Sequence, residues 1–220
     1  MANQRSNPRF SRSSRLTNSL HQLALCIAAQ RSAPSLHLRS AWCEAICFRA
    51  ASRFGDVNRL RRRDLTISPE GLKLVFLTWK NDQRHEGHTV FIQRSASVLC
   101  FVKLTEDYIK ALEGAAVYPQ DGFMLPQILE DSNAVLPFTP STYDDMKRLK
   151  FAVLRKMGLD PTSFGMHAAK VGAIYALREA GFDREDIRIR SGWKKGSAMP
   201  ERYAKKALSK AKEMDTALAL

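Results

Sequence analysis

Residues 72–93 constrain the fold most, because they interrupt a pattern that is otherwise helical. They read LKLVFLTWK, then the polar run NDQRHEGH, then TVFIQ. Two runs rich in β-branched and aromatic residues on either side of a polar turn predict a β-hairpin. We therefore expect a mainly α chain with a small antiparallel β-hairpin or sheet, which is the α+β class.

Apolar residues recur at intervals of three and four on both sides of this hairpin, which is the helical period. The predicted helices cover residues 16–30, 36–52, 97–112, 141–157, 165–180 and 183–189, and a basic helical segment begins near residue 200. Residues 115–140 contain proline and are expected to be partly irregular. Ser141 with Asp144 three residues later forms a capping box, and Gly158 ends the helix that it starts.

The charge balance points to a polyanionic partner. Lys and Arg number 35 against 22 Asp and Glu, which leaves a net charge of +13 on 220 residues. Such an excess raises a positive potential over much of a compact surface, so nucleic acid is the expected partner. An acidic membrane surface is the weaker alternative, because the sequence has no apolar run of 18 residues that could span a bilayer.

Residues 1–34 are treated as a basic N-terminal arm or remnant helix, separate from the domain of residues 35–220. No Asp or Glu occurs before Glu44, whereas six arginines do: Arg5, Arg9, Arg12, Arg15, Arg31 and Arg39. Such a segment suits either a mitochondrial transit peptide or an arm that follows a phosphate backbone, and the sequence leaves both open.

Neither a disulfide framework nor a metal site is expected. The four cysteines, at positions 26, 43, 47 and 100, are few and irregularly spaced, which favours reduced thiols and an intracellular protein. His85 with His88 and Cys43 with Cys47 form pairs, but neither pair has two further ligands at zinc spacing. No cofactor is predicted.

Two further stretches resemble the catalytic domain of the tyrosine recombinase (phage integrase) family. In RFGDVNRLRRRDL, Arg53, Asp56, Leu60 and Asp64 match a register of that family, and Lys80 takes the place of its hairpin lysine. In the second half, a box that begins at His167 and has Lys170 at its last position is followed by Gly192 and Trp193 and then by Tyr203. The context of this half is similar to the Cre-type branch. The resemblance spans roughly residues 36–210.

The resemblance implies DNA cleavage and rejoining through a 3′-phosphotyrosyl intermediate, as in site-specific recombination or integration of a mobile element. Metal-free cleavage of a phosphodiester requires a nucleophile, a proton donor for the leaving oxygen and fixed positive groups. The roles implied are nucleophile for Tyr203, phosphate binding for Arg53, proton donation for Lys80, and phosphate binding or proton transfer for His167 and Trp193. Asp56 is expected to orient neighbouring groups rather than react.

Lys170 departs from the family, which has a second arginine at this position. Lysine keeps the charge but loses the bidentate geometry of arginine, and such a loss costs about 10²- to 10³-fold in rate. In addition, the residues before Arg53 are too few for the family's usual core-binding domain. A catalytically weakened DNA-binding derivative therefore stays an alternative, as does a strand-passing enzyme like a type IB topoisomerase.

The remaining basic residues are assigned to DNA binding or to assembly. Candidate phosphate contacts are Arg59, Arg61, Arg62, Arg63, Lys194 and Lys195, although a solvated basic face is their simpler interpretation. In the family, a helix after the nucleophile packs into a neighbouring protomer, so the segment after Tyr203 suggests a homo-oligomer on DNA; folding back onto its own domain is the alternative. The expected location is wherever DNA is, in the nucleus of a eukaryote or the cytoplasm and nucleoid of a prokaryote, with mitochondrial import left open.

Overall fold

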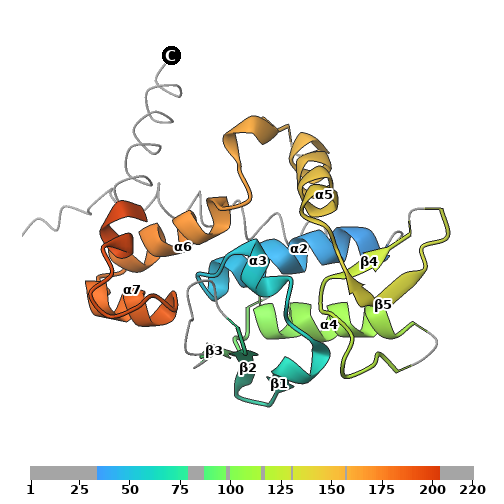
Figure 1. The fold of residues 1–220 in the computed structure, drawn as a ribbon, viewed down its shortest axis with the longest axis horizontal. Helices are drawn as coiled ribbons and strands as arrows, with labels where there is room; N and C mark the ends of the chain where they lie inside the picture. Colours follow the sequence, from blue (N-terminus) through green and yellow to red (C-terminus); the bar gives the residue numbers. More distant parts are fainter. Residues whose placement is uncertain are drawn as a thin grey trace, which may run out of the picture.

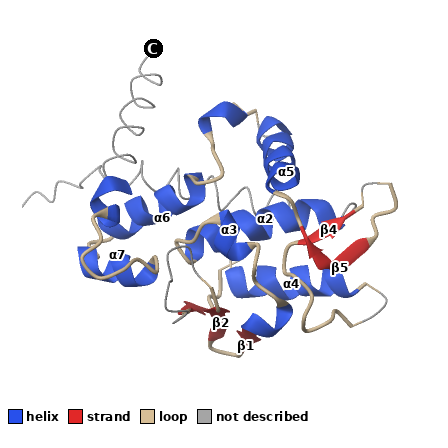
Figure 2. Ribbon diagram, in the orientation of Figure 1, coloured by secondary structure: helices blue, strands red, loops and turns tan. Residues whose placement is uncertain are grey.

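A computed structural model describes residues 34–78, 87–97, 100–114, 117–129, 131–156 and 158–203. The helices are α2 (Pro34–Arg49), α3 (Phe54–Val57), α4 (Phe101–Glu113), α5 (Tyr143–Lys156), α6 (Ala168–Glu179) and α7 (Arg184–Arg190), with short 3-10 turns η1 (Arg62–Asp64) and η2 (Pro161–Ser163). The strands are β1 (Leu65–Ile67), β2 (Gly71–Phe76), β3 (His88–Gln93), β4 (Pro126–Ile128) and β5 (Val135–Pro140). The mainly α fold with small antiparallel sheets is confirmed (Figure 2).

Helix α2 is the central element, and it packs against α3, α4, α5 and α6 (Figure 1). Every residue from Arg39 to Cys47 is buried, as expected for a helix surrounded by protein. Trp42 stacks on Phe101 and Tyr108 of α4, with ring centroids 6.3 and 5.3 Å apart, and its indole Nε1 donates to Thr105 Oγ1 at 3.1 Å. The core is therefore built around the α2–α4 contact.

The three-stranded sheet has the order β1-β2-β3 and is antiparallel throughout. Leu74 pairs with Val90 and Leu72 with Ile92, and these four side chains are buried in the core. The alternate residues Lys73 and Phe91 are exposed, which is the pattern of a sheet covered on one face. The predicted hairpin is present as β2 and β3, and the sequence analysis missed the short third strand β1.

A second sheet, β4 with β5, lies in the region expected to be partly irregular. The capping prediction for α5 is wrong by one residue: Thr142 Oγ1 accepts the Asp145 backbone N–H at 3.1 Å. Ser141 is buried instead, where its hydroxyl donates to the Pro126 carbonyl at 2.8 Å and accepts from Arg39 at 3.0 Å. Ser141 thus ties the second sheet to α2.

The C-terminal part has a small apolar cluster of its own. Ile174 of α6, Ile187 of α7 and Trp193 are buried together, with Met199 and Tyr203 packed against them. Residues 199–203 are helical, in agreement with a helix that begins near residue 200. Three predicted segments lie outside the described residues: the helix of residues 16–30, residues 1–33 of the basic arm, and the segment after Tyr203.

Candidate active site

Arg53 sits at the residue before α3, where the chain enters the helix in an extended conformation. Its backbone N–H donates to Asp56 Oδ2 at 3.3 Å, and its own Nη1 lies 3.9 Å from the same oxygen. Asp56 is therefore both the cap of α3 and the counter-charge of Arg53. The Arg53 side chain is only 12% exposed, and among the described residues Nη1 has no hydrogen-bond partner.

Lys170, one turn into α6, is fully buried. Its Nζ donates to the Ser191 carbonyl at 3.4 Å and lies 4.7 Å from the centroid of the Trp193 ring. Burial is the main cause that lowers the pKa of Lys170 to about 7; the positive charge of Arg53 lowers it further, while Asp56 and Cys47 raise it. Two cations from distant parts of the sequence, Arg53 and Lys170, thus occupy one small region.

Trp193 connects Lys170 to Tyr203. The Trp193 and Tyr203 ring centroids are 5.3 Å apart, with the rings tilted by 47°. The indole is 5% exposed, yet its Nε1 has no hydrogen-bond partner among the described residues. Tyr203 is half-buried, on the short helical segment that follows. Lysine, indole and phenol therefore form a continuous row.

Buried donors without an acceptor are the most informative feature of this region. Buried polar groups nearly always have a partner, so Arg53 Nη1 and Trp193 Nε1 are exceptions that need an explanation. The hydroxyls of Ser52 and Ser191, next to Arg53 and to the Lys170 hydrogen bond, are buried and unpartnered in the same way within the described part of the chain. The acceptor oxygens of a phosphate could accept hydrogen bonds from these N–H groups.

The other predicted catalytic residues are placed less closely. His167 is exposed at the N-terminus of α6, three residues before Lys170. Lys80 lies outside the described residues, in the connection between β2 and β3. The strand ends that this connection joins are near the site, because Phe76 pairs with His88 and the charge of Lys170 helps to lower the pKa of His88.

The arginine run after Arg53 is used partly within the protein. The Arg61 guanidinium lies 4.3 Å from the Phe123 ring centroid and binds the Asp121 carbonyl, and Arg63 forms an ion pair with the Asp121 carboxylate. Arg62 donates to the Leu65 carbonyl at 3.3 Å. Arg59 is exposed; its backbone N–H donates to the Asp56 carbonyl at 3.4 Å, and within the described ranges its side chain has no hydrogen bond or ion pair. A cavity of about 180 Å³ beside Asp56 is lined by Arg59, Arg61 and Arg63 together with Phe76 and Leu77.

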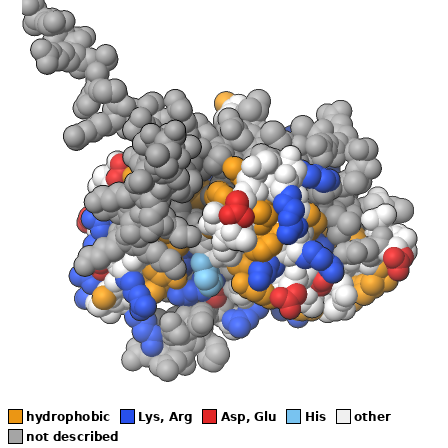
Figure 3. Space-filling model, turned by 90° about the horizontal axis from the view of Figure 1, so that it is seen from above, with side chains coloured by type: hydrophobic (Ala, Val, Ile, Leu, Met, Phe, Trp, Pro, Cys, Tyr) orange, Lys and Arg blue, Asp and Glu red, His pale blue; other side chains and the backbone are white. Residues whose placement is uncertain are grey.

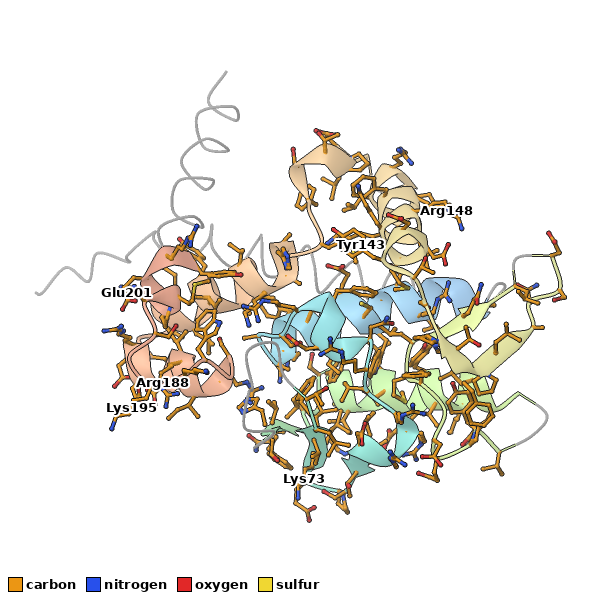
Figure 4. All side chains as sticks on the ribbon, viewed as in Figure 1. Lys73, Tyr143, Arg148, Arg188, Lys195 and Glu201 are labelled. Carbon is orange, nitrogen blue, oxygen red and sulfur yellow. The ribbon has the colours of Figure 1, made fainter. Side chains whose placement is uncertain are left out.

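Lys194 and Lys195 are exposed directly after Trp193. Lys195 lies at the same end of the molecule as Arg188 and Glu201 (Figure 4). Basic side chains occur at several places on the face shown in Figure 3, between hydrophobic ones. The described residues contain no group of His, Cys, Asp and Glu that could hold a metal ion, and none of their helices has the length and apolar character needed to cross a membrane.

Two residues that the sequence analysis did not assign to the site lie against it. His88 Nε2 is 3.3 Å from the Arg190 carbonyl, and burial is the main cause that lowers its pKa. Arg190 ends α7 and contacts both α2 and β3. Their contacts are with backbone carbonyls, which leave no pattern in the sequence.

Known structures share this arrangement of elements. The XerH site-specific recombinase bound to difH substrate superposes with a TM-score of 0.60 at 14% identity over 86% of this chain and 48% of that one. XerA recombinase gives 0.61 at 12% identity over 90% and 61%. The Tn1549 transposon integrase with circular intermediate DNA gives 0.57 at 15% identity over 92% and 62%. The chain has the tyrosine recombinase catalytic-domain fold.

The chain spans about half to three-fifths of the length of these recombinases and integrases. No family model and no curated protein matches the sequence. The three solved structures that share the fold are 12–15% identical to this chain in sequence.

Proposed function

We propose that this chain cleaves and rejoins double-stranded DNA through a 3′-phosphotyrosyl intermediate, as a Cre-like site-specific recombinase or integrase of a mobile element. The observation that carries the proposal is the row from Arg53 through Lys170 and Trp193 to Tyr203. Two of its buried donors, Arg53 Nη1 and Trp193 Nε1, have no hydrogen-bond partner among the described residues, and a phenol lies at its end. The fold supports the proposal, since solved structures of this fold include recombinases bound to DNA.

Each step of the reaction has a residue in this chain. The Tyr203 hydroxyl oxygen attacks phosphorus, the P–O5′ bond breaks, and the 3′ phosphate stays on the tyrosine. Lys80 gives its proton to the leaving 5′ oxygen, and His167, which can also bind the phosphate, takes the phenol proton. Arg53, Lys170 and Trp193 bind the non-bridging oxygens, where negative charge develops. A free 5′ hydroxyl then reverses the step on a second DNA end, without ATP.

A second candidate function is DNA binding without cleavage. Lys170 favours it, because a single ammonium cannot form the paired hydrogen bonds of a guanidinium. Strand passage of the topoisomerase IB kind uses the same residues and differs in whether a second end is joined. The same proposal places the protein with DNA inside the cell and has it assemble through the segment after Tyr203. It also assigns DNA contacts to six basic residues: Arg59, Arg61, Arg62, Arg63, Lys194 and Lys195.

The test is a covalent trap. The protein is incubated with a pool of duplexes that have a random central sequence and one nick, so that cleavage beside the nick releases a short strand and prevents rejoining. We expect wild type to form an adduct that survives denaturing detergent, and Tyr203→Phe to form none. Binding of the pool without any adduct would support the binding function instead, and relaxation of a supercoiled plasmid would identify strand passage.

A further inference from the structure

Arg190 joins three elements through its guanidinium. Its Nε and Nη2 donate to the Arg49 carbonyl at 3.1 and 2.5 Å, and its Nη1 donates to the Phe91 carbonyl at 2.9 Å. Arg49 is the last residue of α2, and Phe91 lies in β3. The C-terminal end of α7 is thereby attached to the central helix and to the sheet.

The hydrogen bonds from Arg190 are suited to holding the C-terminal end of α7 against α2 and β3. The last carbonyls of a helix have no partner within the helix and carry partial negative charge, so a cation there is stabilising. A guanidinium keeps its charge even where burial lowers the pKa of Arg190, and its planar fork fixes direction as well as distance. His88 Nε2 lies 3.3 Å from the Arg190 carbonyl, so β3 contacts both the side chain and the backbone of Arg190.

The segment after Arg190 carries the second half of the candidate site. The Ser191 carbonyl accepts from Lys170, and Trp193 follows two residues later. Trp193 and Tyr203 belong to the small C-terminal cluster, whereas Phe54, the residue after Arg53, belongs to the main core. The position of the indole and the phenol relative to Arg53 therefore depends on how this cluster is attached to the core.

We propose that Arg190 is a positioning residue: by binding the Arg49 and Phe91 carbonyls, it fixes the 191–193 segment, and with it Trp193 and Tyr203, relative to Arg53. This inference rests on the proposed DNA cleavage for its consequence in catalysis. Reacting groups that are misplaced by about 1 Å lose on the order of 10²-fold in rate, so a tether outside the site has a measurable effect.

The experiment compares Arg190→Ala and Arg190→Lys with Arg178→Ala, which removes an exposed arginine of α6 and so makes the same change in charge. The probe is the random-sequence nicked duplex pool, used at saturating concentration. For Arg190→Ala we expect adduct formation to slow by about 10- to 100-fold while the Kd for the pool changes by less than about threefold. Arg190→Lys should recover part of the rate, because an ammonium reaches one carbonyl, and Arg178→Ala should match wild type.

Hydrogen exchange tests the tether without reference to activity. The amides of Gly192 and Trp193 donate to the Ile189 and Arg188 carbonyls at 3.1 Å each, so their exchange reports on this segment. In Arg190→Ala we expect these amides to exchange faster while α4 keeps the protection of wild type. If wild type forms no adduct but this exchange pattern appears, the cleavage proposal fails and the tether stands. Exchange and adduct rates equal to those of Arg178→Ala, or loss of protection throughout α4, would overturn the tether.

Discussion

The Nζ of Lys170 lies over the indole of Trp193, 4.7 Å from the ring centroid, in a fully buried position. A cation on the face of an aromatic ring is attracted by the ring's negative face, and the attraction grows as water is excluded. The cost of burial is still visible, because the pKa of Lys170 falls to about 7. The protonated Lys170 places a second positive charge in the region of Arg53, at the free-energy cost of burying the ammonium.

The first prediction concerns stability against pH. The pKa of Lys170 is about 7 in the folded chain against an ordinary value of 10.5, so between these values the unfolded chain binds the proton more tightly. The free energy of unfolding should therefore rise from pH 7 towards 8.5, as part of a change on the order of a few kcal/mol over the whole interval. Below pH 7 both states are protonated, and this dependence should disappear. Chemical denaturation at several pH values measures it.

Lys170→Met is the control for this pH dependence, since it keeps an unbranched side chain without charge. The other titratable groups that face Lys170 are Arg53, Asp56, Cys47 and His88, and they are unchanged in this variant. Burial lowers the pKa of His88 below its ordinary value of 6.5, so its effect is complete below the pH interval used. An equal rise in stability with pH in wild type and Lys170→Met would contradict the assignment.

The second prediction concerns Lys170→Arg. A guanidinium at this position can give two parallel hydrogen bonds to a phosphate, whereas the ammonium gives a point charge. We expect the rate of adduct formation on the nicked pool to rise by about tenfold or more, given that one such contact contributes about 10²- to 10³-fold. Lys170→Met should form no detectable adduct. An unchanged rate in a folded Lys170→Arg variant would show that another residue limits cleavage.

Some elements of the fold can be predicted from the sequence and others cannot. Helix α4 and the β2–β3 hairpin follow from local periodicity, which a sequence displays directly. Strand β1 has three residues, and β4 begins at Pro126, so neither has enough length for a period to appear. Ser141 looks like a helix cap by spacing, but Arg39, 102 positions away, binds its hydroxyl. A long-range contact of this kind overrides the local signal.

In the candidate site, too, long-range contacts could not be predicted from local sequence signals. The spacing of Arg53, His167, Lys170, Trp193 and Tyr203 was readable only through a family resemblance, since nothing local joins residue 53 to residue 203. Asp121 could not be found in this way, although it binds both Arg61 and Arg63 across some 60 positions. Arg190 and His88 were missed because their partners are backbone carbonyls, which any residue provides.

The third prediction separates two neighbouring arginines. Arg59 is exposed beside Asp56 and its cavity, so Arg59→Ala should weaken binding to any duplex and reduce the slope of log K against log salt by about 1. Arg61 lies over Phe123 and binds the Asp121 carbonyl, so Arg61→Ala should reduce that slope by less than Arg59→Ala does and cost about 0.5 to 1 kcal/mol of stability. Fluorescence anisotropy with a random-sequence duplex at several salt concentrations, together with denaturation, makes the comparison. Equal slopes for both variants would contradict it.

The fourth prediction concerns the buried ion pair between Glu44 of α2 and Lys150 of α5, whose Nζ and Oε2 are 2.8 Å apart. Both side chains are nearly inaccessible to solvent, so Lys150→Met alone leaves the Glu44 carboxylate buried without a counter-charge. This change should cost about 3 to 5 kcal/mol of stability. The double variant Glu44→Leu with Lys150→Met removes both charges and should recover most of that loss. Denaturation of both single variants and the double variant gives the coupling energy, and additive losses would contradict a coupled pair.

The same double variant separates stability from function, because Lys150 Nζ also donates to the Gly165 carbonyl at 3.1 Å. Gly165 lies two residues before His167, so this bond fixes the approach of the chain to α6 and to Lys170. We expect the double variant to be stable yet to form the covalent adduct more slowly than wild type, since no group replaces the donor to Gly165. Glu44→Gln keeps that donor and an acceptor for Lys150, and it should retain a rate close to that of wild type. Equal adduct rates in the double variant and Glu44→Gln would show that Lys150 contributes to stability alone.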